Sequence, residues 1–203
     1  TVVVDGKERD SVDNVRTKLG DVVDVNFDLH AQQQQSEALA KAAETGTLTK
    51  EQERGMSAEQ KAAIEKQMKE RSAALSKNKA LNDAFNSGME AKNAKNWDAA
   101  IQGFQKAAEI DPTQNVIYGN LAESYMELAK TKTGADQQAA LDKAAEAYKK
   151  AIEIAPTDAN YHNNYAIALA KMKKFPEMEA ELNKAIELDP TNKGRYYYNL
   201  GAI

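Results

Sequence analysis

Histidine is the side chain that most often does acid–base chemistry or binds a metal near neutral pH, and this sequence contains two, His30 and His162. Neither has a second histidine, a cysteine or a paired carboxylate at the spacing that a metal site or a catalytic dyad needs. No serine lies in a nucleophile elbow, and no glycine-rich loop is placed to cradle a phosphate. The sequence therefore predicts that both histidines lie on the surface and that the chain is not an enzyme, with no catalytic residue, metal or cofactor.

Asparagine is the other side chain whose spacing points to chemistry. Asn86, Asn120, Asn164 and Asn199 are each followed by a variable residue and then by glycine or alanine, and Asn86 precedes Asn120 by 34 residues. A carboxamide both donates and accepts hydrogen bonds, so an asparagine can pair with a peptide bond in both directions. A row of such amides would hold an extended chain by its backbone. This requires a repeating element that presents them on one side.

One helix ending occurs three times, as AAEIDPT from Ala107, AIEIAPT from Ala151 and AIELDPT from Ala185. Before each ending, large and small residues recur in identical steps of three, four, three and five. Such steps place the side chains on one helix face, and each proline ends its helix. The three sets are Trp97, Ala100, Phe104, Ala107 and Pro112; Leu141, Ala144, Tyr148, Ala151 and Pro156; and Phe175, Met178, Leu182, Ala185 and Pro190.

Another helix precedes each of these endings and carries a small residue, Gly88, Ala122 or Ala166, where a neighbour can approach closely. Gly201 occupies the same position after the last ending. The sequence therefore predicts a repeated antiparallel helix pair, and its period and pattern resemble the tetratricopeptide repeat family. The resemblance implies an all-α fold, a helix-turn-helix superhelix or α-solenoid, with repeats at 81–114, 115–158 and 159–192 and a partial fourth at 194–203. Four residues depart from the family pattern: Ala84, Ser87, Met178 and Leu182.

The second repeat is longer than the others by ten residues, between Lys130 and Leu141. Shared between two antiparallel helices, they would lengthen each by about one and a half turns. Gly134 and Asp136 suit the tip and the next N-cap. The insertion is either a finger that contacts a partner or a tolerated surface extension, and the low cost of insertions at loop tips favours the second.

Upstream of the repeats the sequence changes character twice. Residues 1–29 contain the alternating runs TVVVDGK and DVVDVNFDL with an Asp5-Gly6 turn signal, which predicts strands left from an upstream domain. They faintly resemble the end of a carboxypeptidase regulatory-like β-sandwich, which implies an exported or cell-envelope location, such as the bacterial periplasm. Residues 30–80 are rich in Ala, Gln, Glu and Lys, and capping boxes at Thr49 and Ser57 predict a helical linker or stalk leading into residues 81–203.

The family resemblance implies that the first helix of each pair lines a concave groove. Asparagine at this position also bonds neighbouring helices or water in the family, and both roles stay open. Relatives that grip a C-terminal carboxylate use Lys and Arg where this chain has Phe85, Asn160 and Asn164, so that clamp is not predicted. The residues expected to line the groove are Asn82, Phe85, Asn86, Met89, Lys92, Asn93, Val116, Gly119, Asn120, Glu123, Met126, Glu127, Asn160, Asn163, Asn164, Ile167, Ala170, Lys171 and Asn199.

Charge and composition limit the class of partner. The net charge is -4 and Lys and Glu are interspersed, so a nucleic-acid groove is not predicted, and no apolar run approaches membrane-spanning length. The chain begins within a predicted strand and ends within a predicted helix, which favours a piece of a longer protein. The sequence predicts a module that binds an extended or helical segment of another protein. The alternative is a scaffold that self-associates, through a C-terminal end that carries Tyr196, Tyr197, Tyr198 and Leu200.

Overall fold

A computed structural model describes residues 2–4, 7–10 and 58–201, which divide into two compact units, one up to Ala74 and one from Leu75. In the first unit, β1 (Val2–Val4) pairs antiparallel with β2 (Lys7–Asp10). These strands flank the predicted turn signal. The predicted strand in DVVDVNFDL, His30 and the helix start at Thr49 lie outside the described residues, and the domain division 1–29, 30–80 and 81–203 stays a prediction.

Helix α3 (Ala58–Asn93) begins directly after Ser57, where the sequence predicts a helix start, and continues into the second unit. The predicted lead-in helix and the first helix of the first repeat are therefore one helix of 36 residues. Ile64 and Met68 are half-buried, whereas Leu75 is 57% exposed. The apolar side chains along this part of the helix are thus partly open to solvent.

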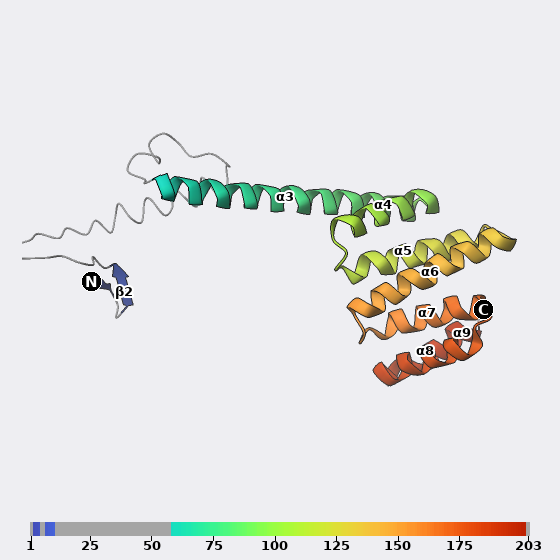
Figure 1. The fold of residues 1–203 in the computed structure, drawn as a ribbon. Coiled ribbons are helices and arrows are strands. Elements are labelled where there is room, and N and C mark those ends of the chain that lie inside the picture. The colour runs from blue at the N-terminus through green and yellow to red at the C-terminus, as the bar shows by residue number, and fades with distance from the viewer. Residues whose placement is uncertain (1, 5–6, 11–57, 202–203) are drawn as a thin grey trace, which may run out of the picture. The chain divides into compact units, whose positions relative to one another are not determined.

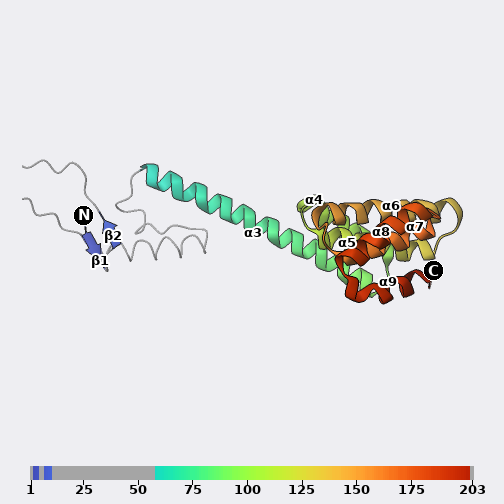
Figure 2. The same cartoon turned by 90° about the horizontal axis from the view of Figure 1, so that it is seen from below.

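The second unit is a stack of helices in which each packs on the next in chain order (Figure 1, Figure 2). After α3 come α4 (Trp97–Ile110), α5 (Asn115–Lys130), α6 (Gly134–Ile154), α7 (Ala159–Lys171), α8 (Phe175–Leu188), a short 3-10 helix (Pro190–Asn192) and α9 (Lys193–Gly201). The end of α3 with α4, α5 with α6, and α7 with α8 follow the order of the three predicted repeats, whose bounds stay a prediction. The all-α solenoid expected from the sequence is confirmed.

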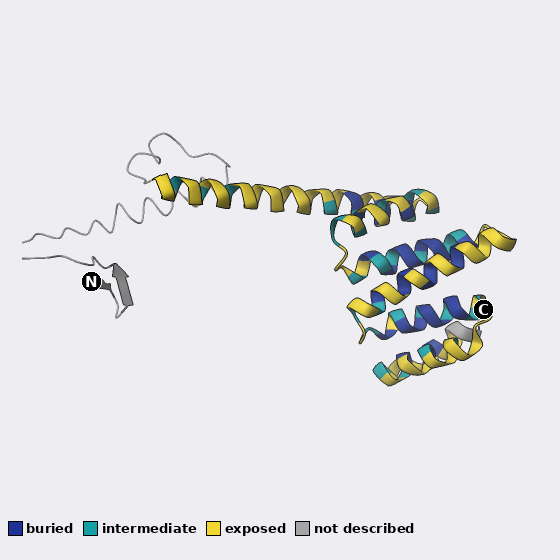
Figure 3. Cartoon of the chain, viewed as in Figure 1, coloured by how far each residue is buried: buried dark blue, intermediate teal, exposed yellow. Residues whose placement is uncertain are grey.

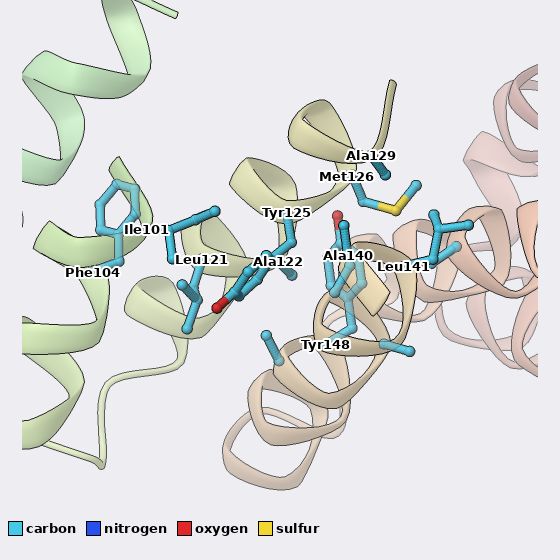
Figure 4. Packing of buried hydrophobic residues seen from close by; sticks show 14 of the residues in the cluster. Ile101, Phe104, Leu121, Ala122, Tyr125, Met126, Ala129, Ala140, Leu141 and Tyr148 are labelled. Carbon is cyan, nitrogen blue, oxygen red and sulfur yellow. The ribbon is translucent and has the colours of Figure 1, made fainter. Parts of the chain in front are cut away.

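Alternation of large and small side chains explains how closely these helices pack. Phe104, Ala107, Ala151 and Ala185 have no exposed surface. Buried stripes run along α5, α6 and α7 in Figure 3, and Figure 4 shows large side chains such as Phe104 and Tyr148 within the core. Large side chains fill the space that the alanines leave, so most of the recurring large and small positions lie on the core faces of the helices, whereas Phe175 is exposed.

Two glycines bring α3 and α4 together. A Cβ atom added to Gly103 would lie 2.6 Å from the Cα and N atoms of Gly88 and 3.1 Å from the carbonyl oxygen of Ala84. A Cβ atom added to Gly88 would lie 2.8 Å from the ring of Phe104. The prediction that Gly88 allows a close approach is confirmed, and the structure identifies Gly103 as the residue that it approaches.

Each second helix ends where its proline predicts, two residues before Pro112, Pro156 or Pro190. After α4, Asp111 accepts hydrogen bonds from the Thr113 backbone N–H at 3.0 Å, the Thr113 hydroxyl at 2.6 Å and the Gln114 side-chain amide at 2.9 Å. These donors, the Thr113 hydroxyl first, lower the pKa of Asp111 to about 2. The carboxylate is therefore ionised at neutral pH and holds the turn between the repeats.

The inserted residues lengthen α6 more than α5. Helix α6 has 21 residues against 14 in α4 and α8, and α5 has 16 against 13 in α7, so the prediction of equal lengthening is wrong. Gly134 has the positive φ expected at the tip, 59°. The N-cap position belongs to Thr133, however, and Asp136 lies in the first turn of α6, where a carboxylate interacts favourably with the helix dipole. The prediction of Asp136 as the N-cap is wrong as well.

His162 is buried, and the prediction that it lies on the surface is wrong. Its Nδ1 atom lies 2.6 Å from Oε2 of Glu181 on α8, and its Nε2 atom lies 3.0 Å from the carbonyl oxygen of Pro156. Both ring nitrogens therefore have a partner within hydrogen-bond distance, one on α8 and one in the turn before α7. The ring therefore connects α7 to α8 and to the turn before α7.

Replacing His162 with alanine is expected to lower the free energy of unfolding by about 2 kcal/mol, because it removes one hydrogen bond to a carboxylate and one to a backbone carbonyl. Urea denaturation followed by circular dichroism measures the change. Glu181→Gln retains an acceptor at the same place and should cost less. A His162→Ala variant as stable as the original chain would show that the two bonds do not hold α7 against α8.

Candidate binding groove

A groove of about 510 Å³ crosses the first helices of three successive pairs. Eight of the residues predicted to line a groove do so: Lys92, Asn93, Glu123, Met126, Glu127, Asn164, Ile167 and Lys171. The complete lining is Lys92, Asn93 and Lys95 at and after the end of α3, Glu123, Met126, Glu127 and Lys130 on α5, Asn164, Ile167 and Lys171 on α7, and Trp97 and Tyr148 on the second helices.

Lysines and glutamates alternate across this groove. Nζ of Lys92 lies 2.5 Å from Oε2 of Glu123, which links α3 to α5, and Lys130 pairs with Glu127 on α5. The phenol of Tyr148 lines the same groove; burial, and then the carboxylates of Glu123 and Glu127, raise its pKa. The phenol is therefore neutral at physiological pH, and the groove offers both signs of charge around an apolar floor.

Two of the predicted asparagine amides already bond to groups of this chain. Oδ1 of Asn120 accepts a hydrogen bond from Lys92 at 2.7 Å, and its Nδ2 donates to the carbonyl oxygen of Val116 at 2.9 Å. Oδ1 of Asn164 accepts from Nδ2 of Asn163 at 3.0 Å. The Nδ2 group of Asn164 has no acceptor among the described residues, so it is the amide group of these two residues best placed to donate to a bound backbone.

Phe85, Asn86, Met89 and Asn163 do not line this groove. Phe85 and Met89 are half-buried against the core, and the Phe85 ring lies 5.5 Å from that of Phe104. Asn86 is exposed on α3. Asn163 is buried, and its Oδ1 atom has no donor among the described residues. Asn199 lies on α9, and its side chain is outside the part that the structure describes.

Sequence reasoning missed four lining residues, Lys95, Trp97, Lys130 and Tyr148. Trp97 and Tyr148 belong to the recurring set of the second helices, which predicts core packing and gives no signal for a groove. Lys130 is the last residue of the lengthened α5. Lys95 follows α3 with a left-handed backbone, φ 57°, which no periodic pattern shows.

Within the described residues, no three histidine or carboxylate side chains come close enough to hold a metal ion. None of the described helices has the length and apolar character to cross a membrane.

Comparison with known families places repeats within residues 135–180. One family model described as a tetratricopeptide repeat matches residues 147–180, and another with the same description matches residues 135–158. The two matched segments cover nearly all of α6, α7 and the beginning of α8, which belong to the second half of the second predicted repeat and to the third.

Curated relatives share parts of this sequence. The chain is 31% identical over 108 residues to Protein STIP1 homolog of Dictyostelium discoideum, a match that covers 53% of this chain and 17% of the relative. It is 35% identical over 107 residues to Heat shock protein STI1 of Saccharomyces cerevisiae, which covers 52% of this chain and 16% of the relative. The chain therefore spans about a sixth of the length of these two relatives.

Among solved structures, the Arabidopsis OM64 TPR domain has a TM-score of 0.51 and 19% sequence identity, and the alignment covers 61% of this chain and 93% of that domain. At this identity the likeness shows the fold alone. It agrees with the helix pairs described above.

Proposed function

We propose that this chain, which carries tetratricopeptide repeats, holds a segment of a partner protein in the groove across α3, α5 and α7, with no reaction of its own. The observation that carries the proposal is the groove itself, because equivalent helices of three successive repeats contribute its lining. A curved stack of helices offers such a continuous surface to an extended or helical segment.

The groove has the parts that such binding needs. Met126 and Ile167 provide an apolar floor, and the charged side chains around them recognise polar groups of either sign. The free Nδ2 group of Asn164 is placed to donate to a backbone carbonyl. Each hydrogen bond of this kind contributes about 1 kcal/mol, so single asparagine substitutions should be mild and combined ones severe.

The groove does not favour a grip on a C-terminal carboxylate. Two of the three positions where relatives use Lys or Arg are occupied by asparagines that bond elsewhere: Oδ1 of Asn160 accepts from Arg195 at 2.9 Å, and Asn164 bonds to Asn163. The third position holds Phe85, which packs on the core. We therefore propose an internal segment of the partner as the ligand.

A random peptide display library selected on the immobilised full chain tests the proposal, with the affinities of enriched peptides measured by fluorescence polarisation. Ile167→Glu puts a charge into the apolar floor and should weaken binding by at least about tenfold, the equivalent of about 1.4 kcal/mol. Combined replacement of Asn86, Asn120 and Asn164 by alanine should also weaken it. Gln102→Glu, an exposed change outside the groove, is the matched control.

Equal affinity of the enriched peptides for the original chain and for Ile167→Glu would overturn the proposed groove. If Ile167→Glu abolishes binding and the triple asparagine variant does not, the groove is supported as the binding site. The hypothesis that the asparagine amides hold the backbone of the peptide is then contradicted. Circular dichroism of each variant checks that the helices are intact.

Self-association is the second candidate function, and the surface of α9 favours it. Tyr197 and Tyr198 are 55% and 77% exposed, next to the fully buried Tyr196. Exposed aromatic side chains of this kind are common at protein contacts. Light scattering across concentration should show oligomers that Tyr197→Ser with Tyr198→Ser abolishes; a monomer at every concentration would exclude this role.

A further inference from the structure

A second hollow, of about 540 Å³, adjoins the groove at the end of the lengthened helices. It shares Met126, Lys130 and Lys171 with the groove, so the two form one continuous depression. No part of the function proposed above uses this second hollow.

The inserted residues of the second repeat build one wall of this hollow. Gln137, in the first turns of α6, lines it and donates through Nε2 to the carbonyl oxygen of Ala129 on α5 at 3.1 Å. This bond fixes the added turns of α6 against the end of α5. The insertion is therefore an ordered part of the surface beside the groove.

The floor of the hollow is apolar. Met126 and Leu141 are buried beneath it, and Phe175, at the start of α8, is 57% exposed beside it. A large aromatic side chain left this open on a folded unit is a place where an apolar side chain of another molecule gains contact.

Every charged residue that lines this hollow is a lysine: Lys130, Lys171 and Lys173. Lys130 pairs with Glu127. Lys171 and Lys173 have no acidic partner among the described residues. Lys173 follows α7 with a left-handed backbone, φ 59°, as Lys95 does after α3. The hollow is therefore an apolar floor with two uncompensated positive charges at its rim.

We propose that this hollow binds an acidic stretch of the partner protein, anchored by a leucine- or phenylalanine-like side chain and flanked by aspartates or glutamates. The proposal rests on the function proposed above, because the bound segment continues from the groove through the residues that the two hollows share. Carboxylates would pair with Lys171 and Lys173 while the apolar side chain covers Phe175. A nucleic acid fits less well, because the net charge of -4 repels a polyanion and only a short stretch of the rim is basic.

Peptide display on the full chain also tests this inference. Enriched peptides should combine acidic residues with leucine or phenylalanine, and their affinity should fall with added salt. Lys171→Glu with Lys173→Glu should weaken these peptides by about tenfold or more and should shift a fresh selection toward lysine and arginine. Lys77→Glu with Lys106→Glu, two exposed changes on α3 and α4 that line neither hollow, is the control for net charge.

The outcomes separate the two proposals. Peptides weakened by Ile167→Glu but not by the double lysine reversal would overturn the acidic-anchor inference and leave the groove intact. Peptides weakened by the lysine reversal but not by Ile167→Glu would support the hollow and overturn the groove. A peptide in which serine replaces the apolar anchor should bind more weakly than the original peptide. Equal affinity of the two peptides would show that charge attraction alone accounts for binding and would overturn the proposed anchor.

Discussion

Replacing Gly103 with alanine is expected to lower the free energy of unfolding by about 3 kcal/mol and to loosen α3 from α4. The added Cβ would lie 2.6 Å from backbone atoms of Gly88 and 3.1 Å from the carbonyl oxygen of Ala84. Backbone atoms in the middle of a helix cannot move aside as the end of a flexible side chain can. The helices must therefore separate, and the contacts of the whole pair weaken.

Chemical denaturation followed by circular dichroism measures this loss, and hydrogen exchange of α3 residues reports whether that helix is released. Gly194→Ala is the matched control, since nothing lies within 4 Å of a Cβ atom there and alanine is the better helix former. Unchanged stability of Gly103→Ala would mean that α3 and α4 do not pack as closely as the structure shows.

Replacing Phe104 with alanine is expected to cost about 4 kcal/mol, because the side chain has no exposed surface and lies against both Phe85 and Gly88. The loss combines the transfer of the ring to water with the cavity that remains between α3 and α4. Melting temperature and urea midpoint should both fall.

A double variant that also changes Gly88 tests whether the loss comes from the contact between Phe104 and Gly88 or only from the loss of apolar surface. Gly88→Ala alone should cost about 2 kcal/mol, because its Cβ would lie 2.8 Å from the Phe104 ring. In the Phe104→Ala background that ring is gone, so adding Gly88→Ala should cost almost nothing. Additive losses in the double variant would contradict the contact between these two residues.

The recurring steps of large and small residues predict the helix pairs, their order and their ends, because each helix must bury the same face against its neighbours. They do not predict Gly103. Its counterparts in the other repeats are Ala147 and Glu181, so no pattern recurs at this position. Close approach depends on which residue faces it across the pair, and only the structure shows that.

The position that Gly103 occupies in the first repeat is occupied by Glu181 in the third, and this explains why His162 is buried. In the first repeat, Gly103 approaches the backbone of Ala84; in the third, the equivalent residues are Glu181 and His162, which meet through a hydrogen bond. One repeat fills the space with small residues and the other with a polar pair. Either residue alone looks like a surface residue, and only comparison of the two positions between repeats would have predicted the contact.

The sequence predicts which helices form the groove, but it predicts less well which of their residues line it. The helix face follows from the period of the repeat. The bonds of the Asn120 amide depend on Lys92, 28 residues away on another helix, and on the rotamer that places its amine there. The uneven lengthening of α5 and α6 likewise depends on composition, since alanine and glutamine extend α6 toward the tip, whereas Thr131 and Thr133 favour the turn.

Lys95 and Lys173 are the two non-glycine residues with a left-handed backbone in the described part of the chain, and each lines one of the two hollows. Glycine adopts this conformation without steric cost, whereas a lysine there carries roughly 1 kcal/mol of strain. A more stable protein would have glycine at both turns and would lose one amine from the lining of each hollow. These turns therefore keep an amine at each hollow at a cost in folding stability, and selection for heat resistance alone should replace both lysines first.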